Sequence, residues 1–182
     1  GPDAPVNFLT SPGSVVAPRA PTVLPPESER VEYEGEIAVV LGARLTRASA
    51  ADAARAVLGV TAACDVTARD LQRRDPTFAR AKSFDTFCPL GPAVAVGVDL
   101  DELEVTTRVN GETRQQGHVR DMIWGIVDLL VYVSRMMTLE RGDVVLTGTP
   151  AGVGQLADGD TLEVEVSGVG TLANPVEAWR QR

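Results

Sequence analysis

The sequence has little of what marks several common classes of protein. Its 182 residues include two cysteines and one histidine, lysine and arginine form no cluster, and the formal net charge is −8. Nucleic acids and anionic membrane surfaces are bound through a basic surface, so we expect neither as a partner. The two cysteines, Cys64 and Cys88, stand in unlike contexts and make no disulfide framework, which favours a reducing cytoplasm.

Long apolar segments are also missing. The longest apolar run, residues 122–133, contains Asp128 and is too short to cross a bilayer. Residues 1–30 are rich in proline and lack the apolar segment of a signal peptide. The opening Gly1-Pro2 could remain from cleavage of an expression tag, in which case the natural protein extends further toward its N-terminus.

The segments that are present predict one β-rich α+β domain, with a hydrophobic fraction of 44% that suits a globular core. Asn110-Gly111 is a hairpin signal, and helical periodicity or capping predicts two short helices at residues 50–58, after Ser49, and 124–137. Alternating or β-branched apolar residues predict the strands, which we place at 6–9, 22–24, 31–41, 60–66, 103–109, 113–116, 144–146, 162–166 and 169–172.

Glu34-Gly35-Glu36 is the most informative short feature. Residues two apart in a strand point the same way, so both carboxylates would enter one site, where they repel unless a proton or a cation lies between them. Gly35 would also let another group approach closely. Taken alone, the pattern fits two solvated glutamates on an edge strand better than it fits a site.

Asp65 changes that balance because it ends an otherwise apolar strand, where an aspartate needs a role. It could cap the segment Thr67 to Leu71, or it could be a metal ligand. Three carboxylates would form an all-oxygen site for Mg²⁺ or Mn²⁺, with Ca²⁺ as an alternative. Zinc is disfavoured because the sequence has no cysteine and histidine grouping.

Two further features could take part in chemistry. Lys82 could offset the charge of a developing enolate or hold a substrate carboxylate, although the residues alone slightly favour a solvated lysine. The glycine-rich turn at residues 147–154 could bind an anion through its backbone N–H groups, or be an ordinary tight turn. His118 follows the predicted hairpin among polar residues, as a solvated loop histidine would.

Taken together, these segments resemble the fumarylacetoacetate hydrolase family. The similarity runs from about residue 6 to residue 176 in the family's order. The matching blocks are residues 33–40 (YEGEIAVV), 65–72 (DVTARDLQ), 81–92 (AKSFDTFCPLGP), 137–143 (MTLERGD) and 146–154 (LTGTPAGVG).

The resemblance implies roles for individual residues. Glu34, Glu36 and Asp65 match the family's metal-binding carboxylates, and Lys82 matches a lysine beside the metal and the substrate. The residues that match polar or carboxylate-binding positions of the pocket are Arg69, which we expect to act with Lys82, and Gln72, Gly148 and Thr149, which we expect to bind substrate.

The resemblance also implies a fold and a range of reactions. We expect a mixed β-sheet roll or sandwich that forms a homodimer, with residues 1–182 as one catalytic domain and residues 1–5 as a tag remnant or the start of a missing lid. The substrate would be a 2-oxo acid or 1,3-dicarbonyl, turned over through a metal-stabilised enolate. We expect C–C bond hydrolysis of an acylpyruvate. The alternatives are an oxaloacetate-type decarboxylase, a 2-hydroxyhepta-2,4-diene-1,7-dioate-type isomerase, and a binding protein without turnover.

Three departures from the family pattern leave the substrate range open. Many members carry a His-x-x-Glu before the position of Val6, and in this chain no histidine precedes His118. Thr10 stands where many relatives have lysine, and Cys64 where many have asparagine.

Overall fold

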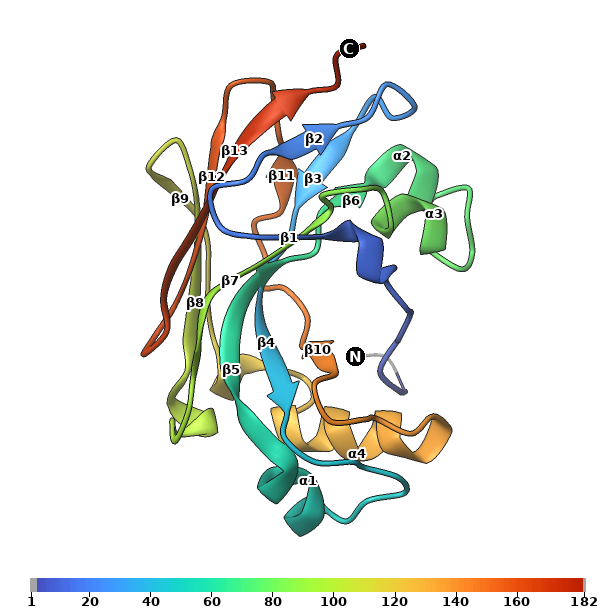
Figure 1. The fold of residues 1–182 in the computed structure, drawn as a ribbon, viewed down its shortest axis with the longest axis vertical. Helices are drawn as coiled ribbons and strands as arrows, with labels where there is room; N and C mark the ends of the chain where they lie inside the picture. The colour runs from blue at the N-terminus through green and yellow to red at the C-terminus, as the bar shows by residue number, and fades with distance from the viewer. Residues whose placement is uncertain (1–2, 182) are drawn as a thin grey trace.

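The strand-forming segments pair into three β-sheets (Figure 1). The computed structural model describes residues 3–181. The sheets have the strand orders β1-β7-β5-β4-β10, β11-β3-β6 and β2-β13-β12-β8-β9. The strands are β1 Val15–Val16, β2 Thr22–Leu24, β3 Val31–Tyr33, β4 Gly35–Leu41, β5 Val57–Cys64, β6 Thr67–Ala68, β7 Cys88–Ala95, β8 Glu104–Val109, β9 Glu112–His118, β10 Val144–Leu146, β11 Gly154–Gln155, β12 Thr161–Val166 and β13 Gly170–Ala178.

Within residues 3–181, four α-helices accompany the sheets, and two of them were not expected. They are α1 Ala50–Ala56, α2 Arg69–Gln72, α3 Ala79–Lys82 and α4 Ile126–Met136, with three 3₁₀ turns at Pro12–Ser14, Leu100–Glu102 and Val119–Asp121. The predicted α1 and α4 are confirmed, and the Ser49 side chain caps α1 by accepting from the Asp52 N–H. The count of two short helices was wrong, because α2 and α3 are single turns that carry no helical periodicity.

The segment 6–9 also differs from expectation, because it forms no strand. Val6 and Leu9 are 74% and 72% exposed, so this stretch has little apolar burial to hold it in a sheet. The predicted fold class, α+β and β-rich, is confirmed.

The core lies between the two five-stranded sheets (Figure 1). On β12 the residues Leu162, Val164 and Val166 are buried and alternate with partly exposed glutamates, as the pattern of the segment predicts. They meet the apolar face of β5, while α1 and α4 pack together at one end of β4 and β5. Within residues 3–181, the helices are all too short or too polar to cross a membrane.

The predicted strand 31–41 is broken at Glu34, where the chain passes from one sheet to another. β3 belongs to the three-stranded sheet, whereas β4 belongs to the first five-stranded sheet. The adjacent segment of the same chain also passes from one sheet to the other at Asp65, between β5 and β6. The Asp65 N–H donates to the Glu34 carbonyl across this junction at 2.8 Å, so the two breaks lie side by side.

Gly35 permits a close contact between β4 and the third sheet. A Cβ atom at this position would lie 1.9 Å from the Thr107 hydroxyl on β8. The Gly35 N–H donates to the Gln115 side-chain oxygen on β9 at 3.0 Å. The prediction that Gly35 admits a close neighbour is therefore confirmed, and the neighbour is Thr107 rather than a ligand.

Candidate metal centre

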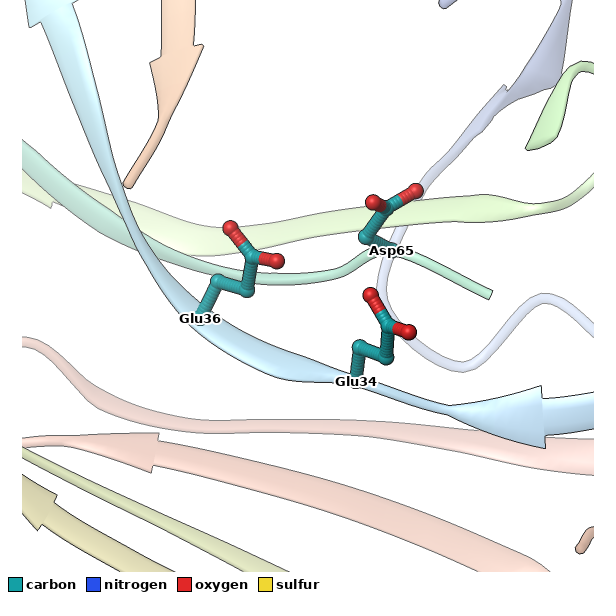
Figure 2. Close-up of side chains that lie close together, drawn as sticks. All are labelled: Glu34, Glu36 and Asp65. Carbon is teal, nitrogen blue, oxygen red and sulfur yellow. The ribbon is translucent and has the colours of Figure 1, made fainter. Parts of the chain in front are cut away.

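The junction where two strands change sheets brings three carboxylates together. Glu34 and Asp65 occupy the paired breaks, and Glu36 follows as the second residue of β4. One oxygen of each carboxylate lies within 4.8 Å of the others, and Figure 2 shows the three side chains converging.

These carboxylates are buried, so the alternative of solvated surface glutamates was wrong. Glu34 is 9% exposed, and Glu36 and Asp65 are each 4% exposed. The capping role considered for Asp65 is also absent, because α2 starts after Ala68 without a side-chain cap. Buried carboxylates at this spacing need a positive charge to offset their repulsion.

Lys82 supplies part of that charge from inside the protein. Its side chain is 2% exposed, which makes the solvated-lysine alternative wrong. The ammonium group donates to Asp65 Oδ2 at 2.5 Å, to Glu34 Oε2 at 3.0 Å and to the Thr67 hydroxyl at 2.8 Å. Burial lowers the pKa of Lys82, but Asp65 and Glu34 outweigh that effect and raise it above its usual value, so the amine stays charged.

One lysine does not offset three carboxylates, and the pKa values of Glu36 and Asp65 show the imbalance. Burial, reinforced by the charge of Asp65, raises the pKa of Glu36 to about 8. Burial also raises the pKa of Asp65 to about 6, although Lys82 opposes the shift. Glu36 therefore retains its proton near neutral pH unless a further cation replaces it.

The donor set fits a hard divalent cation. All the available atoms are carboxylate oxygens, the ligands that Mg²⁺, Mn²⁺ and Ca²⁺ prefer. Glu36 uses only Oε2 and Asp65 only Oδ2 in hydrogen bonds. Across residues 3–181, nothing donates to Glu36 Oε1 or Asp65 Oδ1, so both oxygens are free to bind a cation.

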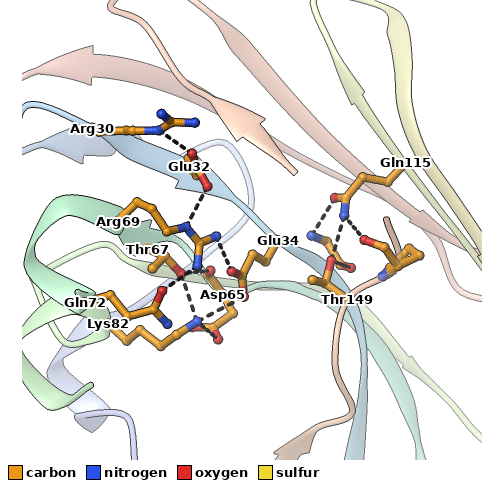
Figure 3. A network of polar contacts seen from close by, with 12 residues as sticks. Arg30, Glu32, Glu34, Asp65, Thr67, Arg69, Gln72, Lys82, Gln115 and Thr149 are labelled. Carbon is orange, nitrogen blue, oxygen red and sulfur yellow. Dashed lines mark hydrogen bonds and ion pairs between the residues drawn. The ribbon is translucent and has the colours of Figure 1, made fainter. Parts of the chain in front are cut away.

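Arg69 and Gln72 lie beside the carboxylates on α2 (Figure 3). The Arg69 guanidinium donates to Glu34 Oε1 at 2.5 Å, to Gln72 Oε1 at 2.6 Å and to Glu32 Oε2 at 2.6 Å. Glu32 also accepts from Arg30 at 2.5 Å. Burial raises the pKa of Glu32, but the two arginines outweigh it and hold the pKa below its usual value.

The glycine-rich turn approaches the carboxylates from the other side. Gly148, at φ 99°, donates its N–H to Glu36 Oε2 at 2.6 Å. The Thr149 hydroxyl donates to the Gly35 carbonyl at 2.8 Å and accepts from Gln115 at 2.7 Å. This hydroxyl is thus engaged within the protein on both sides.

Three site residues were not singled out from the sequence. Gln115, which is 2% exposed, links Gly35 to the turn, and Thr67 accepts from Lys82. The Phe8 ring lies 4.8 Å from the Lys82 ammonium nitrogen. Gln115 and Thr67 fall in polar or short segments with no apolar alternation, so nothing local indicates that their side chains point inward.

A pocket of about 350 Å³ lies next to the turn and does not include the carboxylates. Its lining combines residues 147–150 with Ile37, whose side chain points away from that of Glu36 because they are neighbours on a strand. His118 also lines this pocket, and its Nδ1 accepts from the Arg120 N–H at 3.0 Å. The only histidine is therefore half-buried at the pocket rather than solvated, and it is outside the carboxylate cluster.

Comparison with known proteins identifies the family. Residues 1–177 match the family described as fumarylacetoacetate (FAA) hydrolase C-terminal. The chain belongs to the fumarylacetoacetate hydrolase family.

Individual relatives carry more specific names. The chain is 45% identical over 159 residues to the oxaloacetate tautomerase YisK of Bacillus subtilis, covering 82% of this chain and 53% of the relative. It is 41% identical over 187 aligned positions to the human mitochondrial oxaloacetate tautomerase FAHD2A, covering 96% of this chain and 60% of the relative. The crystal structure of 5-carboxymethyl-2-hydroxymuconate delta-isomerase from Mycobacterium smegmatis superposes with a TM-score of 0.96 at 44% identity, covering 99% of this chain and 72% of that one.

Asp65→Ala should abolish tight binding of Mn²⁺, because it removes a ligand with a free oxygen and a partner of Lys82. We expect the affinity measured by calorimetry to fall by about 100-fold or more, beyond the range typical of changes outside the ligand set. Asp85→Ala is a matched control, since Asp85 is exposed and lies outside the cluster. Unchanged affinity in Asp65→Ala would remove this residue from the site.

Stabilisation by Mg²⁺ should grow with pH. Because the pKa of Glu36 is raised from 4.5 to about 8 on folding, protonation of Glu36 stabilises the folded state. This stabilisation is fully present below pH 4.5, the pKa in the unfolded chain, and is lost as the pH rises through about 8. A cation competes with the same protons, so the increase in Tm on adding Mg²⁺ should be larger at about pH 8.5 than at about pH 6. Thermal unfolding at both pH values measures this, and an equal or larger increase at the lower pH would contradict it.

Proposed function

We propose that this member of the fumarylacetoacetate hydrolase family is a divalent-metal-dependent enzyme that moves a proton within a 2-oxo acid, as a keto–enol tautomerase or isomerase. The names of its relatives support this reaction class, since two are oxaloacetate tautomerases and one is a delta-isomerase. Glu34, Glu36 and Asp65 would hold Mg²⁺ or Mn²⁺.

The observation that best supports this proposal is the buried carboxylate cluster with Lys82 inside it. A metal held by Glu34, Glu36 and Asp65 would supply a Lewis acid that polarises the 2-oxo carbonyl and so favours enolisation. Lys82 would add a second positive charge at a fixed place within the cluster. Its three N–H donors are all used by Asp65, Glu34 and Thr67, so it acts through its charge until one of these acceptors moves away.

The groups on either side of the cluster suit a substrate with two carboxylates. The guanidinium of Arg69 uses three of its five N–H donors on protein acceptors, which leaves two for an anion. On the opposite side, the N–H of Thr149 has no acceptor in the part of the chain that the structure describes. A 2-oxo dicarboxylate could therefore be held at both ends, with its carbonyl over the carboxylate cluster.

Hydrolysis of an acylpyruvate is the second candidate function, and the family description supports it. It would use the same groups to stabilise an enolate leaving group, and in addition requires an activated water. Decarboxylation and metal binding without turnover are outcomes that the same assay detects. Homodimer assembly, a cytoplasmic location and the single-domain boundary remain predictions.

The deciding experiment follows several reactions on one preparation. We expect the enol form of oxaloacetate to convert to the keto form, measured by its ultraviolet absorbance, with Mg²⁺ or Mn²⁺ and not after chelation with EDTA. Acylpyruvates and unsaturated 2-oxo dicarboxylates are assayed in parallel, and release of CO₂ is recorded. Cleavage of acylpyruvates without tautomerisation would replace the proposed reaction, and metal binding without any turnover would reject it.

Lys82→Met should separate metal binding from turnover. We expect tautomerisation to slow by about 100-fold, the loss typical when a group that stabilises an oxyanion is removed, while Mn²⁺ binding is retained. Arg80→Met is the matched control, because Arg80 lies on the same helix and is exposed. Full activity in a folded Lys82→Met protein would make Lys82 dispensable.

A further inference from the structure

Glu32 is a buried carboxylate that lies outside the carboxylate cluster of Glu34, Glu36 and Asp65. It has no role in the proposed reaction. It is 3% exposed and lies on β3, the central strand of the three-stranded sheet. Its neighbours across that sheet are Thr67 on β6 and Gln155 on β11. Alternation along 31–41 places Glu32 on the same side as Glu34, yet the break at Glu34 leaves it outside the cluster.

Both oxygens of Glu32 accept from arginines. Oε1 accepts from Arg30 Nε at 2.5 Å and Oε2 from Arg69 Nε at 2.6 Å. The two arginines differ in exposure, at 51% for the Arg30 side chain and 18% for that of Arg69. Only Arg69 reaches onward to the cluster, as Figure 3 shows.

The orientation of Arg69 depends on its acceptors. Its helix α2 has only four residues, so the backbone alone fixes little of a long side chain. Each of its three guanidinium nitrogens has a different acceptor, namely Glu32, Gln72 and Glu34. Because the guanidinium is planar, the bond from Nε to Glu32 sets which edge faces Glu34.

Removing the negative charge of Glu32 would change the hydrogen-bond geometry between Arg69 and Glu34. Arginine pairs most strongly with a carboxylate when two N–H groups bind both oxygens. In the structure one Arg69 nitrogen contacts one oxygen of Glu34, and Lys82 contacts the other. A guanidinium released from Glu32 could rotate to take both oxygens, and it would then compete with a cation for Glu34.

We propose that Glu32 is a positioning residue that keeps Arg69 in a single-oxygen contact with Glu34, so that Glu34 can ligate a metal and Arg69 can receive a substrate carboxylate. This inference rests on the proposed function for the substrate. Its metal part can be tested without turnover.

The primary test is Glu32→Gln, which keeps the shape of the side chain and removes its charge. We expect Mn²⁺ affinity by calorimetry to fall by about 10-fold or more, the effect typical of residues that orient metal ligands. For a dicarboxylate substrate we expect KM to rise by about 10-fold with a smaller change in kcat. Wild-type metal affinity and KM in a folded Glu32→Gln protein would overturn the proposal.

Arg30→Gln is the matched control. It removes the other partner of Glu32 and leaves the contact with Arg69 in place, so Mn²⁺ affinity should stay within about twofold of wild type. An equal loss in Arg30→Gln and Glu32→Gln would show a general effect of the buried ion pairs and would overturn the positioning role.

A double mutant tests whether the effect of Glu32 on metal affinity depends on Arg69. In an Arg69→Gln background, Glu32→Gln should cause no further loss of Mn²⁺ affinity, because the cation to be positioned is gone. An undiminished loss in that background would overturn the inference. Should Glu32→Gln fail to fold, Glu32→Asp keeps the charge and withdraws the acceptor, and unchanged metal affinity there would overturn it as well.

Failure of this inference can be told from failure of the proposed function. If the wild-type protein binds Mn²⁺ but converts no 2-oxo acid, the proposed reaction is rejected, while the effect of Glu32→Gln on affinity still decides the role of Glu32.

Discussion

Repulsion among three buried carboxylates is the constraint on which the site depends. Glu34, Glu36 and Asp65 have oxygens within 4.8 Å of one another in surroundings that exclude most water. Each neighbouring polar group reduces that repulsion in part, through the ammonium of Lys82, the guanidinium of Arg69 or the N–H of Gly148. These contacts still leave the pKa of Glu36 at about 8, so this carboxyl keeps its proton near neutral pH, a condition that a divalent cation would relieve.

The fold generates this crowding by an unusual use of two antiparallel strands. Because the chain changes sheets at Glu34 and again at Asp65, two residues without ladder partners lie at the same level and point into one space. Gly35 completes the arrangement, since a Cβ atom there would collide with the Thr107 side chain on the facing sheet. The backbone irregularity and the chemistry of the site therefore have the same origin.

The same arrangement explains why one family can include several reactions. In the proposed function the cluster, with its metal, and Lys82 would stabilise an enolate, and an enolate is common to tautomerisation, isomerisation, decarboxylation and cleavage of 1,3-dicarbonyls. What differs between these reactions is the group that moves the proton or activates water. Relatives named as tautomerases and as an isomerase share more than 40% identity with this chain, which fits a common centre with variable surroundings.

The sequence by itself determined the β-rich fold class, most strands, the hairpin at Asn110-Gly111 and both longer helices, because alternation, periodicity and turn chemistry act over neighbouring residues. It also indicated Glu34, Glu36 and Asp65 as a group, partly through family resemblance. Only the tertiary structure decided that these carboxylates are buried, that Lys82 donates to Asp65 and Glu34, and that Glu32 lies outside the cluster and pairs with Arg69. It also revealed α2, α3 and the inward side chain of Gln115. Those features depend on contacts between segments far apart in the chain, and no local pattern of residues encodes them.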